Sequence, residues 1–186
     1  MNQDFFRKAR ANATTWERFL LARDPDSWAI LDTETTGLGL HAEVVQIGII
    51  NGRGNAPMDN VLVRPTVPIE PEAVHVHYIS EAMVANAPSF ADVPPRLRDA
   101  VRNRLLVIYN ADYDLRLLVQ SAMAHGVMPY LPHGGYDCAM LRYAEWVGKW
   151  NDYHGSFRWQ KLEGGDHSAL GDCAATLAVI EKMAGG

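Results

Sequence analysis

Apolar residues at the start of the chain repeat at the spacing of an amphipathic helix. Within residues 4–23 they recur every three or four positions, and this apolar set is Phe5, Ala9, Ala13, Trp16 and Leu20. The segment Asp24-Pro25-Asp26 then interrupts the pattern, because proline does not continue a helix. We therefore expect residues 1–26 to form an N-terminal helical extension, packed on a main domain of residues 27–186.

Shorter apolar runs follow this helix and predict strands. Three of them come in succession with short turn sequences between them, and they cover Trp28–Leu31, Val44–Ile50 and Met58–Val63. The segment Asn51–Asn55 is rich in Asn and Gly, which is typical of a hairpin turn. The three strands therefore predict an antiparallel start to a sheet.

Helices dominate the second half of the chain. Pro65, Pro68 and Pro71 predict an irregular crossing before it, and Leu105–Tyr109 predicts a fourth strand. Helices are expected at residues 80–84, 90–104, about 138–148 and about 168–183, with another that carries Leu115, Leu118, Val119 and Ala122 and ends near Gly126. Three strands come first, and helices and strands alternate after them. This order indicates the α/β class, with a mixed sheet flanked by helices.

The composition excludes some classes of protein but does not change the predicted elements. A chain of 186 residues that is 48% hydrophobic and 21% charged is long enough for one domain with a sizeable core. Its 17 Lys and Arg residues against 22 Asp and Glu residues give a net charge of −5. That charge excludes a binder that attracts polyanions through an overall positive surface, so a nucleic-acid role requires a local patch or a bound metal.

Cysteine content and hydropathy bear on the compartment. The two cysteines, Cys138 and Cys173, are too few for a disulfide framework or a zinc cage, and we expect both to be buried, reduced thiols. No apolar run approaches the ~20 residues that cross a bilayer. We therefore expect a cytoplasmic protein with no membrane partner.

Acidic residues carry the candidate chemistry. Asp32-Thr33-Glu34 directly follows the first predicted strand, and in extended chain the side chains of Asp32 and Glu34 point the same way. Two such carboxylates repel, so one takes up a proton unless a cation lies between them. Oxygen donors favour hard cations such as Mg²⁺ or Mn²⁺. An isolated Asp-x-Glu is more often a solvated turn, so the rest of the chain decides.

Two further acidic segments stand where helices begin. Asn110-Ala111-Asp112-Tyr113-Asp114 follows the fourth predicted strand, and His167–Asp172 opens the last helix. Strand and helix ends of this kind gather at the active sites of α/β sheets. His167 and Asp172 are five positions apart, which is about 140° around an ideal helix. We therefore expect His167 in the loop before the helix and Asp172 on its first turns, both directed at one point.

In this order the segments resemble the motifs of the DEDDh 3′–5′ exonucleases, the superfamily of the polymerase III proofreading subunit, which has a ribonuclease H-like fold. Leu31–Leu38 resembles the first motif, and Val74–Ser80 the histidine-containing loop, with Tyr78 where glycine is common. Asn110–Asp114 resembles the second motif with Tyr113 for phenylalanine, and His167–Asp172 the third in its histidine form.

The resemblance implies a phosphodiesterase that uses two Mg²⁺ or Mn²⁺ ions. Asp32, Glu34 and Asp172 would hold the first ion, and Asp32 would bridge to the second, with Asp114 in support directly or through water. Two divalent cations balance four carboxylates before an anionic phosphate enters. His167 would take a proton from the attacking water, since the ordinary pKa of histidine is about 6.5.

The resemblance also implies a pocket for the terminal nucleotide. Backbone groups of Thr35, Thr36 and Gly37 would lie near the 3′-hydroxyl, and Leu38 against the last base. His77 would contact a phosphate, and Asn110 and Tyr113 the penultimate nucleotide. Each has a structural alternative, namely a turn for the threonines, packing for Tyr113 and helix capping for Asn110.

Three other groups of residues can have either a functional role or a simpler structural one. The aromatic stretch Trp146, Trp150, Tyr153, Phe157 and Trp159 can stack on bases, although packing is the more common use. The arginines Arg96, Arg98, Arg102 and Arg104 can meet a nucleic-acid backbone, although a solvated helix face is more common. His75 and His77 lack a third soft ligand nearby, which disfavours zinc.

The resulting hypothesis is an exonuclease that releases nucleoside 5′-monophosphates from single-stranded DNA, its partner being a nucleic-acid strand with a free 3′ end. An exoribonuclease with the same site is the first alternative, because nothing in the sequence discriminates a 2′-hydroxyl. A non-catalytic nucleic-acid-binding module is the second alternative. The presence of all five residues Asp32, Glu34, Asp114, His167 and Asp172 argues against it.

Overall fold

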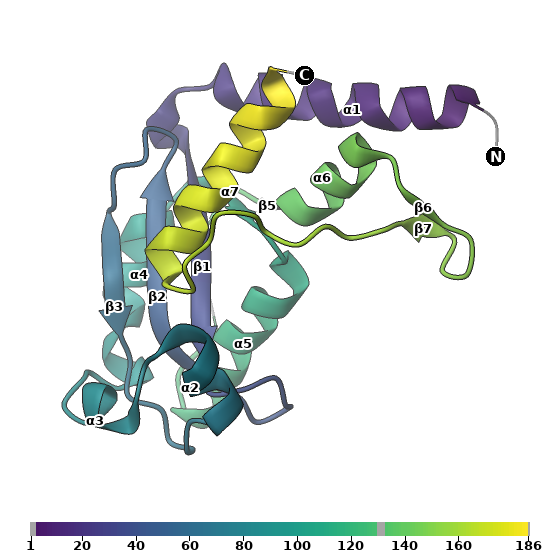
Figure 1. Cartoon of the computed structure of the whole chain (residues 1–186). Helices are drawn as coiled ribbons and strands as arrows, with labels where there is room; N and C mark the ends of the chain where they lie inside the picture. The colour runs from purple at the N-terminus through teal and green to yellow at the C-terminus, as the bar shows by residue number, and fades with distance from the viewer. Residues whose placement is uncertain (1–2, 130–132, 186) are drawn as a thin grey trace.

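Five strands form one mixed sheet in the order β3-β2-β1-β4-β5 (Figure 1). The computed structural model describes residues 3–129 and 133–185. The strands are β1 (Trp28–Thr35), β2 (Val44–Asn51), β3 (Met58–Leu62), β4 (Leu105–Ile108) and β5 (Tyr136–Cys138). The first three are antiparallel neighbours, whereas β4 and β5 run parallel to β1. The expected mixed sheet with an antiparallel start is therefore confirmed.

Helices cover both faces of the sheet (Figure 1). The helices α4 (Pro94–Val101) and α5 (Ala111–Ala124) pack on one face, where Leu31 of β1 joins their side chains in a buried cluster. The opposite face is covered by α7 (Ala169–Ala184), with α6 (Ala139–Val147) beside it, and here Ile30 is buried against Ile180. Because strand side chains alternate between faces, the apolar strand β1 serves both cores.

The N-terminal helix α1 (Gln3–Leu21) packs on α6 and α7. Leu20 is buried in the same cluster as Trp28 and Ile180, and the Trp16 Nε1 donates to Asp137 Oδ2 at 2.6 Å. The expected helix is thus confirmed, and it contributes to the core on the α7 face. None of the described helices is both long and apolar enough to cross a membrane.

Several short elements were not expected from the sequence. The proline-rich crossing contains α2 (Pro71–His77) before the expected short helix α3 (Glu81–Val84). A hairpin of β6 (Trp150–Asn151) and β7 (Ser156–Phe157) lies in the aromatic stretch, and β5 was missed as well. Strands of two or three residues are too short to show alternation, so their pairing partners define them.

Two sequence expectations need correction. The helix expected over residues 90–104 is a 3₁₀ turn at Phe90–Asp92 followed by α4. The helix α4 ends at Val101 because Arg102 leaves the helical region with a ψ of 119°, and Asn103 then adopts a left-handed φ of 59°. Cys173 is fully buried, but Cys138 is only half-buried because it ends the edge strand β5.

Candidate active site

The first two carboxylates lie within β1. Asp32 pairs with Gly48 of β2, and Glu34 pairs with Gln46, so the strand extends four residues beyond the expected end at Leu31. The two side chains project from the same face, as the spacing of two predicts. A central strand gives both groups a fixed backbone, and the covering α7 removes them from water.

A third carboxylate, Asp172, joins them from the first turn of α7. One carboxylate oxygen of each residue, Asp32, Glu34 and Asp172, lies within 4.8 Å of the other two. The Asp172 side chain is fixed in turn, since the backbone N–H of His167 donates to its Oδ1 at 3.2 Å. The predicted convergence of these three acids is therefore present in the fold.

Side chains of the sheet hold the start of α7 in place. The Ala169 N–H donates to Gln46 Oε1, and the Leu170 N–H donates to Asn60 Oδ1, both at 2.9 Å. The first N–H groups of a helix have no partner within the helix, so these bonds cap it. A Cβ on Gly48 would lie 2.7 Å from the Ala169 backbone, so glycine at this position permits the close approach.

Asp114 reaches the same cavity from the first turn of α5. It is only 4% exposed, and its Oδ1 accepts from the backbone N–H and the hydroxyl of Thr33, at 3.0 and 2.7 Å. It lies outside the set of three mutually close carboxylates but lines one cavity with them. Thr33, which lies between Asp32 and Glu34 in β1, therefore fixes the position of the fourth carboxylate, Asp114.

The electrostatics of the cavity favour the binding of a cation. Burial, aided by repulsion from Asp172 and Asp114, raises the pKa of Glu34 from 4.5 to about 8. Burial also raises the pKa of Asp114 from 3.8 to about 7, against the opposing hydrogen bonds from Thr33. The pKa of Asp32 is raised by burial and then by the neighbouring Asp114, Glu34 and Asp172.

These acids fit a divalent cation on chemical grounds. Their donors are all carboxylate oxygens, which are the ligands that Mg²⁺ and Mn²⁺ prefer. Without a cation they must hold protons against their ordinary acidity, and with one they can ionise. The cavity that they line has a volume of about 250 Å³.

His167 stands at the mouth of this cavity. It lies in the loop before α7, two residues ahead of Ala169, as the sequence predicts, and it adopts a left-handed φ of 59°. Its side chain is exposed. The neighbouring Gly165 is also required, because a Cβ there would lie 2.3 Å from Asp172 Oδ1.

The segment after β1 forms a tethered turn beside the carboxylates. The Tyr113 hydroxyl donates to the Gly37 carbonyl at 3.1 Å and lies 2.9 Å from Thr35 Oγ1. Leu38 follows this anchored point and is 76% exposed. Asn110 lines the cavity and occupies the N-cap position of α5 without a capping bond from its side chain. Leu38 and Asn110 are thus open to a ligand.

His77 is buried behind this turn. Its Nδ1 accepts from the Ile79 N–H at 3.0 Å, so the proton is on Nε2, which donates to the Thr35 carbonyl at 3.0 Å. Burial lowers the pKa of His77, which keeps the ring neutral. Both nitrogens are engaged within the protein, so a phosphate contact would require one of these bonds to be exchanged.

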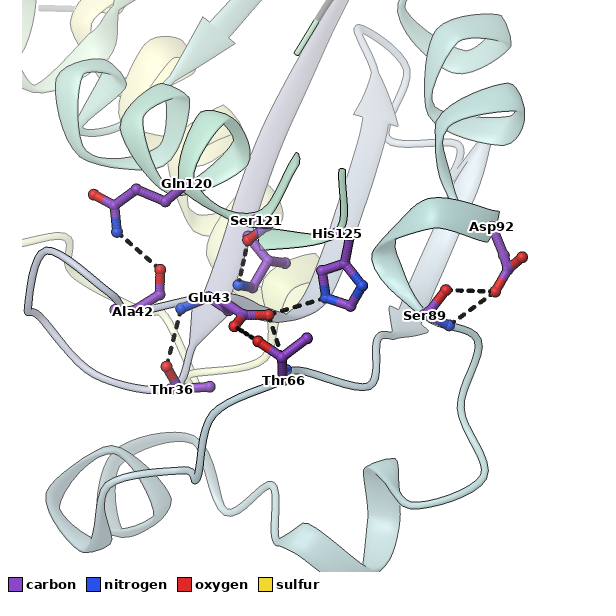
Figure 2. A network of polar contacts seen from close by, with 10 residues as sticks. Thr36, Ala42, Glu43, Thr66, Ser89, Asp92, Gln120, Ser121 and His125 are labelled. Atoms are coloured by element: carbon purple, nitrogen blue, oxygen red, sulfur yellow. Dashed lines mark hydrogen bonds and ion pairs between the residues drawn. The ribbon is translucent and has the colours of Figure 1, made fainter. Parts of the chain in front are cut away.

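A buried polar network fixes the far side of the turn (Figure 2). Thr36 exchanges two hydrogen bonds with the backbone of Glu43, at 2.8 and 3.0 Å. The Glu43 carboxylate accepts from the N–H and hydroxyl of Thr66, and it lies 3.0 Å from His125 Nε2 at the end of α5 (Figure 2). The turn is therefore held at both ends, while the Leu38 side chain at its tip is exposed.

Sequence reasoning missed the residues that support the site. Gln46, Gly48 and Asn60 carry no signal in a single sequence, because a partner more than a hundred residues away gives them their role. Asp166 had a signal, since it directly precedes His167, and it accepts from the N–H and hydroxyl of Ser168 at 3.0 and 2.7 Å. Lys161 also lines the cavity.

The remaining candidate residues make contacts within the protein. Arg102 pairs with Asp99 at 3.0 Å, and Arg104 donates to the Ala100 and Asp26 carbonyls. His75 is exposed and bonds to the Pro71 carbonyl, whereas His77 is buried, so the two do not form a shared site. Asp112 lies in the first turn of α5, just after the N-cap residue Asn110.

A mixed sheet in this order, with carboxylates on its central strand and on two flanking helices, defines the class of ribonuclease H-like exonucleases. The sequence model of the RNase T family, described as "Exonuclease", matches residues 29–180, and the chain belongs to that family. It is accordingly a hydrolytic exonuclease by class.

Two curated relatives cover most of the chain. The "Uncharacterized exonuclease CP81" of Escherichia phage 186 is 39% identical over 176 residues, which is 87% of this chain and 90% of that protein. Exodeoxyribonuclease 10 of Escherichia coli K12 is 35% identical over 159 residues, or 81% of this chain and 66% of that protein. The chain therefore spans about two thirds of the length of exodeoxyribonuclease 10.

Solved structures agree with this membership. Exonuclease X in complex with 5′ overhanging duplex DNA has a TM-score of 0.55 and 31% identity, covering 86% of this chain and 93% of that one. Exonuclease I of Methylocaldum szegediense has a TM-score of 0.62 over 82% of this chain and 39% of that chain. Its 21% identity shows the fold alone.

Proposed function

We propose that the chain is a divalent-metal-dependent 3′–5′ exonuclease that removes nucleoside 5′-monophosphates from single-stranded DNA. The observation that carries this proposal is the convergence of Asp32, Glu34 and Asp172, whose oxygens lie within 4.8 Å of one another in a family of exonucleases. The preference for DNA is supported by the names of two relatives, exodeoxyribonuclease 10 and exonuclease X bound to DNA.

The carboxylates divide between two ion positions in this proposal. Asp32, Glu34 and Asp172 would hold one Mg²⁺ or Mn²⁺ ion, and Asp32 and Asp114 would hold a second. When bound, such ions polarise the phosphoryl oxygens and stabilise charge on the leaving oxygen. Thr33 keeps Asp114 oriented, and Gln46 and Asn60 keep α7 and its Asp172 in place.

His167 serves as the general base. A ring nitrogen takes a proton from the attacking water, whose oxygen forms a bond to phosphorus while the bond to the 3′-oxygen breaks. The leaving 3′-oxygen takes a proton from solvent, so the shortened strand ends in a 3′-hydroxyl, and the terminal nucleotide leaves with a 5′-phosphate. The exposed position of His167 at the cavity mouth lets its ring reach incoming water and return the proton to solvent.

The turn after β1 recognises the strand end. Backbone groups of Thr35, Thr36 and Gly37 face the 3′-hydroxyl, and exposed Leu38 lies against the last base. Asn110 and Tyr113 lie near the penultimate nucleotide, since both line the cavity. The buried His77 supports this pocket by holding the Thr35 carbonyl, so we assign it positioning ahead of phosphate binding.

A strand-degradation assay tests the proposal. A 5′-labelled single-stranded 20-mer with Mg²⁺ or Mn²⁺ should shorten stepwise from its 3′ end. We expect Asp32→Asn to lower the rate about a thousandfold, because ion stabilisation is worth several kcal/mol. We expect His167→Gln to lower it about a hundredfold or more. Asp59→Asn removes an exposed carboxylate on β3 and should leave the rate unchanged.

The same assay separates the alternatives. Cleavage that persists in EDTA, or in Asp32→Asn at the wild-type rate, overturns the metal mechanism. Faster digestion of an RNA oligomer than of the DNA oligomer of the same sequence would favour an exoribonuclease. Tight binding of the oligomer without cleavage under Mn²⁺ would favour a non-catalytic binding module.

A further inference from the structure

The β6–β7 hairpin projects away from the sheet, on the side where α1 begins (Figure 1). Its base is fixed by aromatic packing. Phe157 stacks on Phe5 with ring centroids 5.7 Å apart, and Trp150 meets Phe5 edge-on at 5.5 Å. Because β6 and β7 also pair with each other, the hairpin has a defined position relative to the rest of the fold. Part of the aromatic stretch therefore packs, as expected.

Two other aromatic residues of this stretch, Tyr153 and Trp159, face solvent, whereas Trp146 stacks on Tyr143. Tyr153, in the turn between the strands, is 91% exposed, and Trp159, just after β7, is 67% exposed. Single exposed aromatic side chains are common on protein surfaces, so the groups around them decide what they can bind. A hollow of about 390 Å³ lies beside them, lined by Asn151, His154, Ser156, Phe157, Arg158 and Trp159.

This exposed surface is continuous with the carboxylate cavity. Trp159 is followed directly by Gln160 and Lys161, and both of these line the cavity that contains Asp32. The Gln160 carbonyl accepts from the Tyr109 hydroxyl at 2.9 Å, which anchors the segment where β4 ends. A nucleic-acid strand bound in the cavity would therefore lie next to Trp159 without any movement of the protein chain.

Residues 149–161 carry a net positive charge, whereas the protein as a whole is negatively charged. Residues 149–161 carry the basic residues Lys149, Arg158 and Lys161 against a single acid, Asp152, which gives +2 in a chain of net charge −5. All three basic side chains are exposed. Interleaved aromatic and basic side chains are the features that bind single-stranded nucleic acid, by stacking and by phosphate contact.

We infer that residues 149–161 form the binding surface for the part of the substrate strand upstream of its 3′ end. Trp159 stacks on a base close to the cavity, Tyr153 on a base further upstream, and Arg158 and Lys161 meet phosphates. The inference rests on the proposed function and extends it, because it makes a strand several nucleotides long the preferred substrate.

Length dependence of cleavage tests the stacking. The kcat/KM is measured for oligo(dT) of 20 and of 3 nucleotides, and the ratio of the two values is compared between variants. We expect Trp159→Ala to lower this ratio about tenfold, because stacking on one aromatic side chain contributes about that factor. Trp159→Phe, which keeps an aromatic face, should restore most of it. Phe19→Ala removes a similarly exposed aromatic residue from α1 and should leave the ratio unchanged.

Salt dependence of binding tests the phosphate contact. The Kd of a fluorescent 20-mer of oligo(dT) is measured by anisotropy in EDTA, over a range of NaCl concentrations. Lys161→Gln should reduce the slope of log Kd against log salt by about 0.7, the value for one phosphate contact on a single strand. Arg53→Gln removes an exposed cation from the β2–β3 turn and should not change the slope.

The outcomes separate this inference from the proposed function. If the wild-type protein cleaves the 20-mer but Trp159→Ala and Lys161→Gln behave as their controls do, the hairpin is not a nucleic-acid surface, and its exposed aromatic residues serve another partner such as a protein. If the wild-type protein cleaves neither oligomer, the proposed function fails, and the inference fails with it.

Discussion

At the scale of single residues, the carboxyl groups of the cavity owe their properties to one another and to their burial. Glu34 alone in extended chain would ionise near its ordinary pKa of 4.5, but in the folded protein its pKa is about 8. Burial is the largest cause, and repulsion from Asp172 and Asp114 adds to it. The repulsion predicted from the Asp-x-Glu spacing acts on Asp32, because Glu34 helps to raise the pKa of that carboxyl. A group held in this way is more stable with a cation beside it.

The stability of the metal-free protein should consequently depend on pH. Below about pH 4, Glu34 is protonated in both the folded and the unfolded chain, so it contributes no pH dependence. Between its unfolded pKa of 4.5 and its folded pKa of about 8, the folded chain binds more protons. The free energy of unfolding should therefore fall as the pH rises through this range, and Asp114 should act likewise up to about pH 7.

Thermal unfolding in EDTA and in MgCl₂ at pH 5, 6.5 and 8 measures this effect. The Tm difference between the two conditions should grow with pH, because binding a cation displaces the protons. Glu34→Gln should flatten the pH dependence in EDTA. A gain from MgCl₂ that is greatest at pH 5 would contradict the raised pKa values.

At the scale of elements, the site depends on where α7 meets the sheet. Asp172 reaches the cavity only because the first turn of α7 lies against β2, next to Gly48. Gln46 and Asn60 then replace the hydrogen bonds that the first turn lacks. The phase of the helix, and with it the direction of Asp172, is thereby set by strand residues.

Gly48→Ala should separate the helix from the sheet. The added methyl group would lie 2.7 Å from the Ala169 backbone, so α7 must shift. We expect a loss of about 1–3 kcal/mol in the free energy of unfolding in urea, together with weaker Mn²⁺ binding by calorimetry. Gly39→Ala is the matched control, since nothing lies within 4 Å of the added group. Equal stability of the two variants would show that this contact does not position α7.

The position of the turn after β1 is likewise set by residues of other elements. Tyr113 of α5 fixes one end, and the Glu43 network fixes the other (Figure 2). The Leu38 side chain at the tip is exposed. A turn anchored at both ends presents backbone groups in one arrangement, which suits the recognition of a strand end. The buried network therefore fixes the turn that we propose as the site of strand-end recognition.

At the scale of the whole molecule, α1 completes the core on the α7 face. Leu20 is almost fully buried against residues of β1 and α7, whereas its neighbour Phe19 is 61% exposed. The helix lies outside the residues that match the family, yet it shares a hydrophobic cluster with them. We propose that the extension of residues 1–26 stabilises the domain of residues 27–186 and the hairpin together.

Substitutions at these two neighbours test that role. Leu20→Ala should lower the free energy of unfolding by about 2–5 kcal/mol, the range for a buried leucine. Phe19→Ala should change it by about 0.5 kcal/mol or less, because its side chain is largely solvated. Urea denaturation followed by circular dichroism provides both values. A Leu20→Ala variant as stable as the wild type would show that α1 is only loosely attached.

The sequence by itself determined the fold class, the order of the long elements and the identity of the acids and the histidine. Apolar spacing along 19 residues of α1 or 16 of α7 is a local property, and so are the segments around Asp32, Asp114 and Asp172. Each of these signals lies within one stretch of chain, so no partner is needed to interpret it.

Only the tertiary structure decided the rest. The three-residue strand β5 exists because β4 offers it a partner, and β1 extends to Thr35 because β2 pairs with it. Likewise Thr33 orients Asp114 only once α5 brings Asp114 to it, 81 positions away. Roles that arise from contact between distant segments have no local pattern, because the energy that creates them appears only when the chain has folded.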